Sequence, residues 1–181
     1  AWVERAEALL PVLAQQAVIM QRKYDVVVTN PPYMGLRNMS SKLFDYVTLN
    51  YPMAKSDLYG AFVQKCVEVF CARNGYVAMI TQHVWMFTSG FEKLRRKIIK
   101  EETIIAMAHL GTRAFEDISG EVVQTCAFVL RRGILRNYKG VYSRLVDYET
   151  PLKKEVAFLQ KENQYIQQAE SYEKMPGAPI C

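Results

Sequence analysis

The apolar residues of this chain follow two different spacings, and the spacing changes from one segment to the next. Apolar side chains at helical intervals predict helices over residues 3–22, 40–50, 57–73 and 151–169, and a further helix from Ser89 to about residue 100. Short β-branched and apolar runs predict buried strands over residues 24–29, 76–81, 103–110 and 122–131. Strands that alternate with helices are typical of an α/β fold.

The last part of the pattern predicts how the sheet ends. Residues 140–147 follow the strand 122–131 after a return through Gly133 and Gly140, which predicts a hairpin. We therefore expect a mostly parallel sheet with an antiparallel hairpin at its edge. Beyond residue 169 we expect an extended tail.

The glycines restrict how the chain can bind a cofactor. The chain has 181 residues, half of them hydrophobic, which is enough for one domain with a buried core. No two of its nine glycines are separated by a single residue, so it has no G-x-G turn, no Rossmann fingerprint and no P-loop. The chain therefore cannot hold a nucleotide-like cofactor on a Gly-rich loop of its own.

Apolar runs and cysteines point to a cytoplasmic setting. The longest apolar runs have strand length, far below the roughly 18 residues of a membrane span, so we expect no membrane partner. The first residues, AWVERAEALL, lack the basic start and long apolar core of a signal peptide. The four cysteines form no C-x-x-C pair, which predicts a reducing compartment and no metal site.

The net charge of +5 is unevenly distributed along the chain. Residues 91–144 contain 11 basic and 6 acidic residues, a difference of +5, and the rest of the chain is balanced overall. A basic segment is compatible with a polyanionic partner such as DNA, because Lys and Arg replace the counterions of phosphates. On charge alone, a solvated helix face is the better explanation.

One loop carries most of the chemical information. Asn30-Pro31-Pro32-Tyr33 comes directly after the strand 24–29, and ligands of open α/β sheets bind at the carboxyl ends of strands. The prolines fix their own φ angles and restrict the residues before them, so the loop is stiff. It presents the Asn30 amide, the Pro31 carbonyl and the Tyr33 ring, which suit a planar substrate with an amino group. The alternative is a surface turn that happens to contain two prolines.

The segments around this loop resemble a known enzyme family. DVVVTNPPY, SDLYGAFVQK and NGYVAMIT, in this order, resemble the catalytic half of N6-adenine DNA methyltransferases of the NPPY class, over residues 24–132. NPPYMG, KSDLYGAF, GYVAMITQHVWMF, SGEVVQTCAFVLR and KMPGAPI are similar to the PglX-type methyltransferases of BREX phage-defence systems. The fold implied is the C-terminal half of a Rossmann-like S-adenosylmethionine-dependent methyltransferase sheet.

The resemblance implies methyl transfer from S-adenosylmethionine to N6 of an adenine flipped out of double-stranded DNA. The catalytic residues are then Asn30, Pro31, Pro32 and Tyr33, with the Asn30 oxygen and the Pro31 carbonyl accepting the two amino hydrogens. Preorganised acceptors stabilise the charge that develops on nitrogen, so no strong base is needed. Tyr33 and Phe115 would stack on the flipped base. Phe115 could instead be a loop residue packed on the core.

The resemblance also indicates a cofactor site. Asn30 would lie near the sulfonium, Phe62 would pack on the cofactor adenine, and Asp57 would border the pocket. Phe62 lies on an apolar helix face, so core packing is an equally good explanation. Arg113 and the stretch 116–121 would contact DNA or close over the base, a weaker expectation.

The chain lacks two regions that the family requires. The Gly-containing cofactor motif would lie upstream of Ala1, and a target-recognition region would follow the tail. We therefore expect residues 1–137 to be the catalytic half of the methyltransferase domain and residues 138–181 to be an edge strand and connector. The chain alone should be inactive, and its exposed sheet edge could form a dimer. Partner proteins of a defence system are further candidates.

Other functions fit the same loop. Enzymes that methylate glutamine in proteins or guanine in RNA use NPPY-like loops, although Phe115 and the basic segment favour DNA. A non-catalytic DNA-binding fragment is an alternative from a different class, and an intact NPPY argues against it. A restriction–modification fusion would carry its nuclease outside this sequence. A Gly-rich turn upstream of Ala1 would distinguish an enzyme from a binding fragment.

Overall fold

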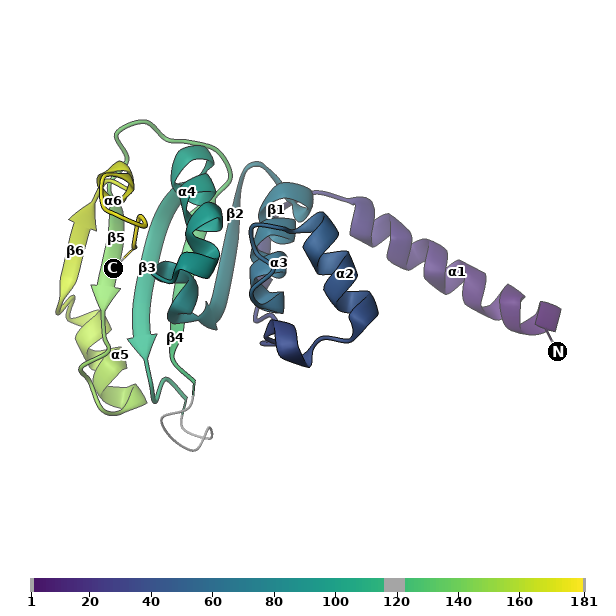
Figure 1. The fold of residues 1–181 in the computed structure, drawn as a ribbon, viewed down its shortest axis with the longest axis horizontal. Helices are drawn as coiled ribbons and strands as arrows, with labels where there is room; N and C mark the ends of the chain where they lie inside the picture. Colours follow the sequence, from purple (N-terminus) through teal and green to yellow (C-terminus); the bar gives the residue numbers. More distant parts are fainter. Residues whose placement is uncertain (1, 116–122, 181) are drawn as a thin grey trace.

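The chain folds around one mixed β-sheet with most of its helices on one face (Figure 1). The computed structural model describes residues 2–115 and 123–180, with only the backbone of residues 2–8. Within these residues the strands are β1 (Tyr24–Thr29), β2 (Cys71–Gln82), β3 (Thr103–Gly111), β4 (Thr125–Arg131), β5 (Gly140–Arg144) and β6 (Gln164–Gln167). The α-helices are α1 (Trp2–Gln21), α2 (Ser41–Asn50), α3 (Leu58–Lys65), α4 (Glu92–Glu101), α5 (Pro151–Leu159) and α6 (Glu170–Glu173).

The sheet has the strand order β1-β2-β4-β3-β5-β6 in the described residues. β1 and β2 are parallel, as are β3 and β5, whereas β4 lies antiparallel between β2 and β3. Thr125 at the start of β4 pairs with both Gln82 and Gly111. The carboxyl ends of β1, β2 and β3 therefore share one edge of the sheet, and the loops after them lie together there.

The α/β prediction is confirmed, but the predicted edge hairpin is wrong. Residues 140–147 were expected to pair with 122–131, whereas β5 pairs in parallel with β3 and the edge strand is β6, antiparallel to β5. The sheet is mixed: β1, β2, β3 and β5 point one way, and β4 and β6 point the other way. β4, which follows β3 in the chain, lies between β2 and β3. One side of β3 is therefore occupied by β4, and β5 pairs with the other side of β3.

Three further expectations from the sequence need correction. The helix predicted over 57–73 ends as α3 at Lys65, continues as a π-helix (Cys66–Phe70) and passes into β2. The helix predicted over 151–169 is α5 followed by β6, whose sequence QYIQ is too polar to predict a strand. The tail is packed rather than free: Ile180 is buried, its N–H donates to the Met86 carbonyl, and Arg95 Nη2 donates to the Gly177 carbonyl.

The two faces of the sheet are covered unequally. The face under α3 and α4 carries the core, with Trp85 and Leu130 completely buried and three cysteines buried as free thiols. The opposite face has a hollow of about 430 Å³ lined by Ala106, Ala127 and Phe158 among other residues. α1 extends away from the sheet (Figure 1), and the edge strand β1 leaves Val28 73% exposed. The end of the molecule formed by α1 and β1 therefore presents apolar surface.

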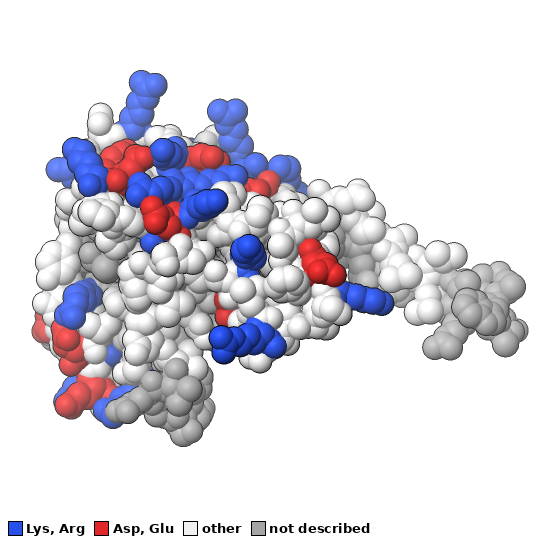
Figure 2. All heavy atoms as spheres, in the orientation of Figure 1, with Lys and Arg blue, Asp and Glu red and all other residues white. Residues whose placement is uncertain are grey.

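On the face shown in Figure 2, the basic residues lie mainly away from the loops at the carboxyl ends of the strands. Figure 2 shows most Lys and Arg side chains at the opposite edge, interleaved with Asp and Glu. Lys97 pairs with Glu68 at 2.8 Å and Lys100 with Glu173 at 3.0 Å. This arrangement agrees with solvated, partly paired charges rather than a DNA-binding patch at the predicted site. No helix in the described part of the chain is long and apolar enough to cross a membrane.

Candidate active site

The four predicted catalytic residues of the loop after β1 differ in how far they are exposed. Asn30 and Pro32 are exposed, Pro31 is buried and Tyr33 is half-buried. The Tyr33 hydroxyl lies 3.5 Å from Asn30 Oδ1 and 3.5 Å from the Ile80 carbonyl oxygen. Burial raises the pKa of Tyr33, so its hydroxyl stays protonated near neutral pH. Asn30 is thus exposed at the strand end beside an aromatic ring.

Asp57 fastens this loop to the start of α3. Its Oδ1 accepts hydrogen bonds from the Met34 N–H at 2.9 Å and the Tyr59 N–H at 3.3 Å, so it caps α3 and holds the loop together. Leu58 N–H donates to the Met34 carbonyl at 3.0 Å. Burial raises the pKa of the Asp57 carboxyl, and the backbone hydrogen bonds act against that rise. The carboxylate therefore positions the loop, a role that sequence reasoning did not assign to it.

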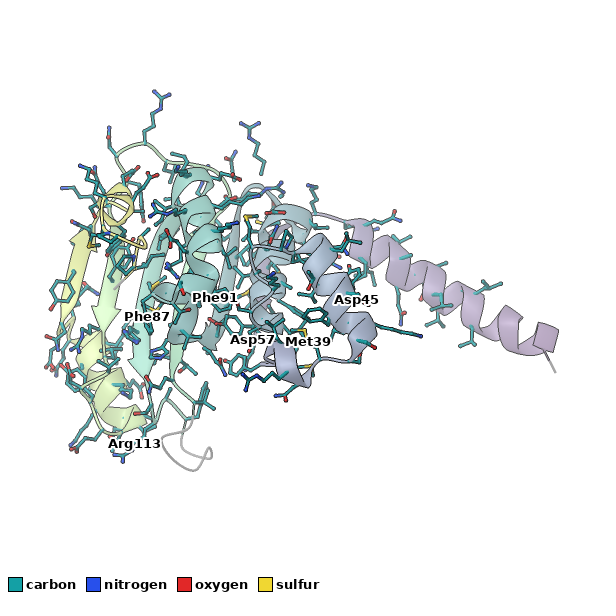
Figure 3. All side chains as sticks on the ribbon, viewed as in Figure 1. Met39, Asp45, Asp57, Phe87, Phe91 and Arg113 are labelled. Carbon is teal, nitrogen blue, oxygen red and sulfur yellow. The ribbon has the colours of Figure 1, made fainter. Side chains whose placement is uncertain are left out.

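A row of aromatic rings supports Tyr33 from below. Tyr33 meets Tyr59 edge to face, with ring centroids 5.9 Å apart, and Tyr59 stacks on Phe91 at 5.4 Å. Figure 3 shows Phe91 and Asp57 in neighbouring positions, and the Ser56 hydroxyl, next to Asp57, donates to the carbonyl of Gly90, next to Phe91. Gly60 allows the close packing, because a Cβ there would lie 2.7 Å from Phe91 Cε1. The row fixes one edge of the Tyr33 ring and connects it to the core.

Phe62 and Phe115 extend into solvent. Phe62 is 37% exposed, whereas Val63, the next residue of α3, is completely buried. Phe115 is 39% exposed in the loop after β3. Neither ring stacks on another aromatic side chain within residues 2–115 and 123–180. Both rings thus have surface available for a ligand. The loop that contains Asn30 follows β1 and the loop that contains Phe115 follows β3, and β2 and β4 lie between these two strands in the sheet.

The remaining expectations concern the loop after β3. Arg113 has a left-handed backbone conformation, with φ of 53°, and extends toward the end of the molecule that contains α5 (Figure 3). The stretch 116–121, expected to contact DNA or close over the base, lies outside the described residues. No group of three His, Cys, Asp or Glu side chains in the described ranges is arranged to hold a metal ion.

Two histidines form a pair that sequence reasoning missed. His83 Nδ1 and His109 Nε2 lie 2.7 Å apart, joining the turn after β2 to β3, and Phe87 packs edge-on against His83. Burial lowers the pKa of both rings, and burial together with His83 lowers that of His109 to about 4. Both rings are neutral near pH 7, so one donates a hydrogen bond to the other. The only sequence signal was their place near the ends of two predicted strands: His83 two residues after 76–81, and His109 near the end of 103–110.

Comparisons with known proteins place the chain in a methyltransferase family. Residues 4–115 match the family model of the Eco57I restriction-modification methylase. The chain is 46% identical over 168 residues to the adenine-specific methyltransferase PglX of Lacticaseibacillus casei (strain Zhang), covering 90% of this chain and 14% of that protein. It is 41% identical over 179 residues to the adenine-specific methyltransferase BrxX of Escherichia coli O9:H4 (strain HS), covering 98% and 15%. The resemblance to PglX-type methyltransferases is confirmed, and the chain spans about one seventh of these relatives.

The fold also matches a solved structure. A Listeria monocytogenes protein assigned to the class I S-adenosylmethionine-dependent methyltransferases superposes with a TM-score of 0.54 at 16% identity, over 78% of this chain and 43% of that chain. This likeness concerns the fold alone, and it agrees with the α/β sheet described above. Because the family model covers more than half of its residues, the chain belongs to the Eco57I restriction-modification methylase family.

Proposed function

We propose that this chain carries the catalytic loop of an adenine-specific DNA methyltransferase of a restriction-modification or phage-defence system. The proposed reaction transfers a methyl group from S-adenosylmethionine to N6 of an adenine flipped out of double-stranded DNA. The observation that carries the proposal is the exposed Asn30 amide at the carboxyl end of β1, beside Tyr33 and on a loop that Asp57 fastens. Similarity to PglX and BrxX supports the choice of adenine.

The loop supplies acceptors and positioning rather than a base. The amino nitrogen of adenine is a poor nucleophile because its lone pair is delocalised into the ring. Asn30 Oδ1 and the Pro31 carbonyl oxygen accept its two hydrogens and stabilise the positive charge that develops on it. Tyr33 supports one face of the base and Phe115 the other, which offsets the cost of removing the base from the duplex. One amino proton leaves to water when the N6–carbon bond has formed.

The chain's residues also fit one side of a cofactor site. S-adenosylmethionine supplies an electrophilic methyl group when it is bound. The Phe62 ring is exposed on α3, close in the chain to Asp57, and can cover an adenine ring. Asn30 is exposed at the strand end, where the sulfonium would face it. We infer that the Gly-rich part of this site belongs to sequence before Ala1.

Similarity to much longer relatives supports a second set of proposals. Residues 1–137 form the catalytic half of the methyltransferase domain, and residues 138–181 connect it to a target-recognition region. The isolated chain is inactive, and it self-associates through the exposed edge of β1, where Val26 and Val28 face solvent. The full-length protein acts in the cytoplasm on DNA with partner proteins of its defence system.

The test is methyl transfer by the full-length protein with and without Asn30. Asn30→Ala should lower methylation of adenine-containing duplex DNA by about 10²–10³-fold, the usual cost of removing one stabilising group from a charged transition state. DNA binding should be retained. Asn50→Ala is the matched control, because Asn50 is exposed and its side chain donates only within α2, to the Tyr46 carbonyl.

The same assay separates the alternative functions. Unchanged activity of Asn30→Ala would remove Asn30 from the mechanism. Methylation of a glutamine-containing protein or of RNA guanine, in place of DNA adenine, would move the loop to another substrate class. DNA binding by the wild-type protein without any methyl transfer would indicate a non-catalytic binding fragment.

A further inference from the structure

A buried lysine lies beneath the start of the loop after β3. Lys154, on α5, is only 3% exposed, although long cations are rarely buried. Its Nζ donates to the Leu110 carbonyl at 2.8 Å and to the Leu145 carbonyl at 2.8 Å. These carbonyls lie at the carboxyl ends of the neighbouring parallel strands β3 and β5, where the chain leaves the sheet. One ammonium group thus joins the ends of two neighbouring strands.

The chain turns sharply directly after this point. Gly111 has a φ of +67°, and a Cβ there would lie 2.9 Å from Val146 Cγ1. Arg113 also has a left-handed backbone, which is costly for a residue with a side chain. Phe115 follows two residues later. Phe115 is thus only five residues from Leu110, whose carbonyl accepts the hydrogen bond from Lys154, so the position of Leu110 affects the direction of the Phe115 ring.

The surroundings of Lys154 explain why a cation occupies this position. Ala114, Lys154 and Phe158 line one small hollow between the loop and α5. Burial lowers the pKa of Lys154, the Asp147 carboxylate acts in the opposite direction, and Arg113 adds to the lowering. A methionine could fill the space, but it would remove the ammonium donor from the Leu110 carbonyl and leave the Leu145 carbonyl with the longer bond from the Tyr148 N–H, at 3.4 Å. The ammonium group therefore serves to hold the backbone.

We propose that Lys154 is a positioning residue for base stacking: it holds Leu110 and the start of the loop so that Phe115 can cover the flipped adenine. The inference rests on the proposed function and deepens it. It places a determinant of base capture on α5, outside residues 1–137, and so makes the segment after β5 part of the catalytic unit.

The experiment uses the full-length protein and duplex DNA with 2-aminopurine at the target adenine, whose fluorescence rises when the base is flipped out. Lys154→Met should raise the KM for DNA and the concentration needed for the fluorescence rise by about tenfold, because small misplacements are costly. Lys154→Arg keeps a cationic donor, so its KM for DNA and its fluorescence response should stay close to those of the wild-type protein. Lys153→Met is the matched control, since Lys153 is exposed and pairs with Glu149.

A double substitution separates positioning from general stability. In a Phe115→Ala background, Lys154→Met should cause no further loss of the fluorescence signal, because both changes act through the same ring. Additive losses, or normal base flipping by Lys154→Met, would overturn the inference. If Lys154→Met does not fold, Lys154→Gln, which keeps one donor, should show the same non-additivity. Normal methylation by both Asn30→Ala and Phe115→Ala would instead reject the proposed function itself.

Discussion

The loops after β1 and after β3 lie at the same edge of the sheet, but different parts of the chain hold them. The first loop is stiffened by its own prolines and fastened by Asp57, at the start of α3. The second is held by residues that come much later in the chain: Val146 packs against Gly111, and Lys154 bonds to the Leu110 carbonyl. The first loop owes part of its stiffness to its own prolines, whereas the start of the second loop is held by the turn after β5 and by α5.

This difference indicates what each loop can contribute. A loop that is stiff by its own sequence can hold two hydrogen-bond acceptors at a fixed position, which electrostatic stabilisation of a transition state requires. The described start of the second loop, residues 111–115, contains no proline, so we expect it to adjust when a base arrives, which suits an aromatic side chain that captures the base. Substitutions in the first loop should therefore change the rate of the chemical step, and those in the second should change DNA capture.

The largest effect should follow from releasing the first loop. Asp57→Ala removes the acceptor for the Met34 N–H and the cap of α3, which should lower stability by about 1–2 kcal/mol. Methyl transfer at saturating DNA should fall by about 10²-fold, because the Asn30 acceptor is displaced. Single-turnover rates and thermal unfolding of the full-length protein measure the two effects.

Two variants make this result specific. Asp57→Asn keeps an acceptor oxygen and should lose much less activity than Asp57→Ala. Asp45→Ala, at an exposed position on α2, should behave as wild type. A change in the KM for DNA with an unchanged single-turnover rate would contradict the division of roles between the loops.

Removal of the ring on the second loop should have a smaller and different effect. Phe115→Ala should raise the KM for DNA by about tenfold, the scale of one lost base–aromatic contact, while the rate at saturating DNA changes less. Phe115→Leu should give an intermediate value. Phe44→Ala, another exposed phenylalanine, is the control. An equal fall in the saturated rate and no change in KM would assign Phe115 to the chemical step.

Replacement of Phe62, on α3, should affect the cofactor rather than DNA. Phe62→Ala should weaken S-adenosylmethionine binding by roughly fivefold, the scale of one aromatic contact, and leave DNA affinity unchanged. Calorimetric titration of the full-length protein measures this directly. If Phe62 is instead a packing residue, the variant will unfold at a lower temperature and bind the cofactor normally. Its 37% exposure favours the first outcome.

The same contrast explains what could be predicted from sequence. β1 and its NPPY loop were predictable because each is encoded within a few residues, by a β-branched run and by two prolines. The start of α3 was predictable from its apolar spacing, but its end at Lys65 and its cap Asp57 were not. The position of β5 was not, because pairing between distant strands depends on where β4 is inserted. Lys154 and Arg95 look like ordinary solvated cations in the sequence. Only the folded chain shows that both are buried and bonded to carbonyl oxygens.

The smallest effect should come from pH, and it should act on the second loop. The pKa of His109 is lowered from its usual 6.5 to about 4, so the folded protein favours the neutral ring. As the pH falls from about 6.5 toward 4, the unfolded chain binds a proton that the folded chain does not, and stability decreases. Because the His109 ring is partly exposed and its charge is screened by solvent, the free energy of unfolding should fall by only roughly 1 kcal/mol over this pH interval.

The wild-type protein and His109→Gln, compared by denaturant unfolding between pH 7 and pH 4, test this expectation. The variant lacks the titrating ring, so its stability should fall less steeply over this interval. Its neighbours His83, Arg144, Lys154 and Asp147 are unchanged in both proteins, so their contributions largely cancel. Because the His83–His109 pair lies directly before the second loop, the KM for DNA should rise at low pH before the saturated rate changes. Parallel changes in both quantities would mean that the two loops are not held independently.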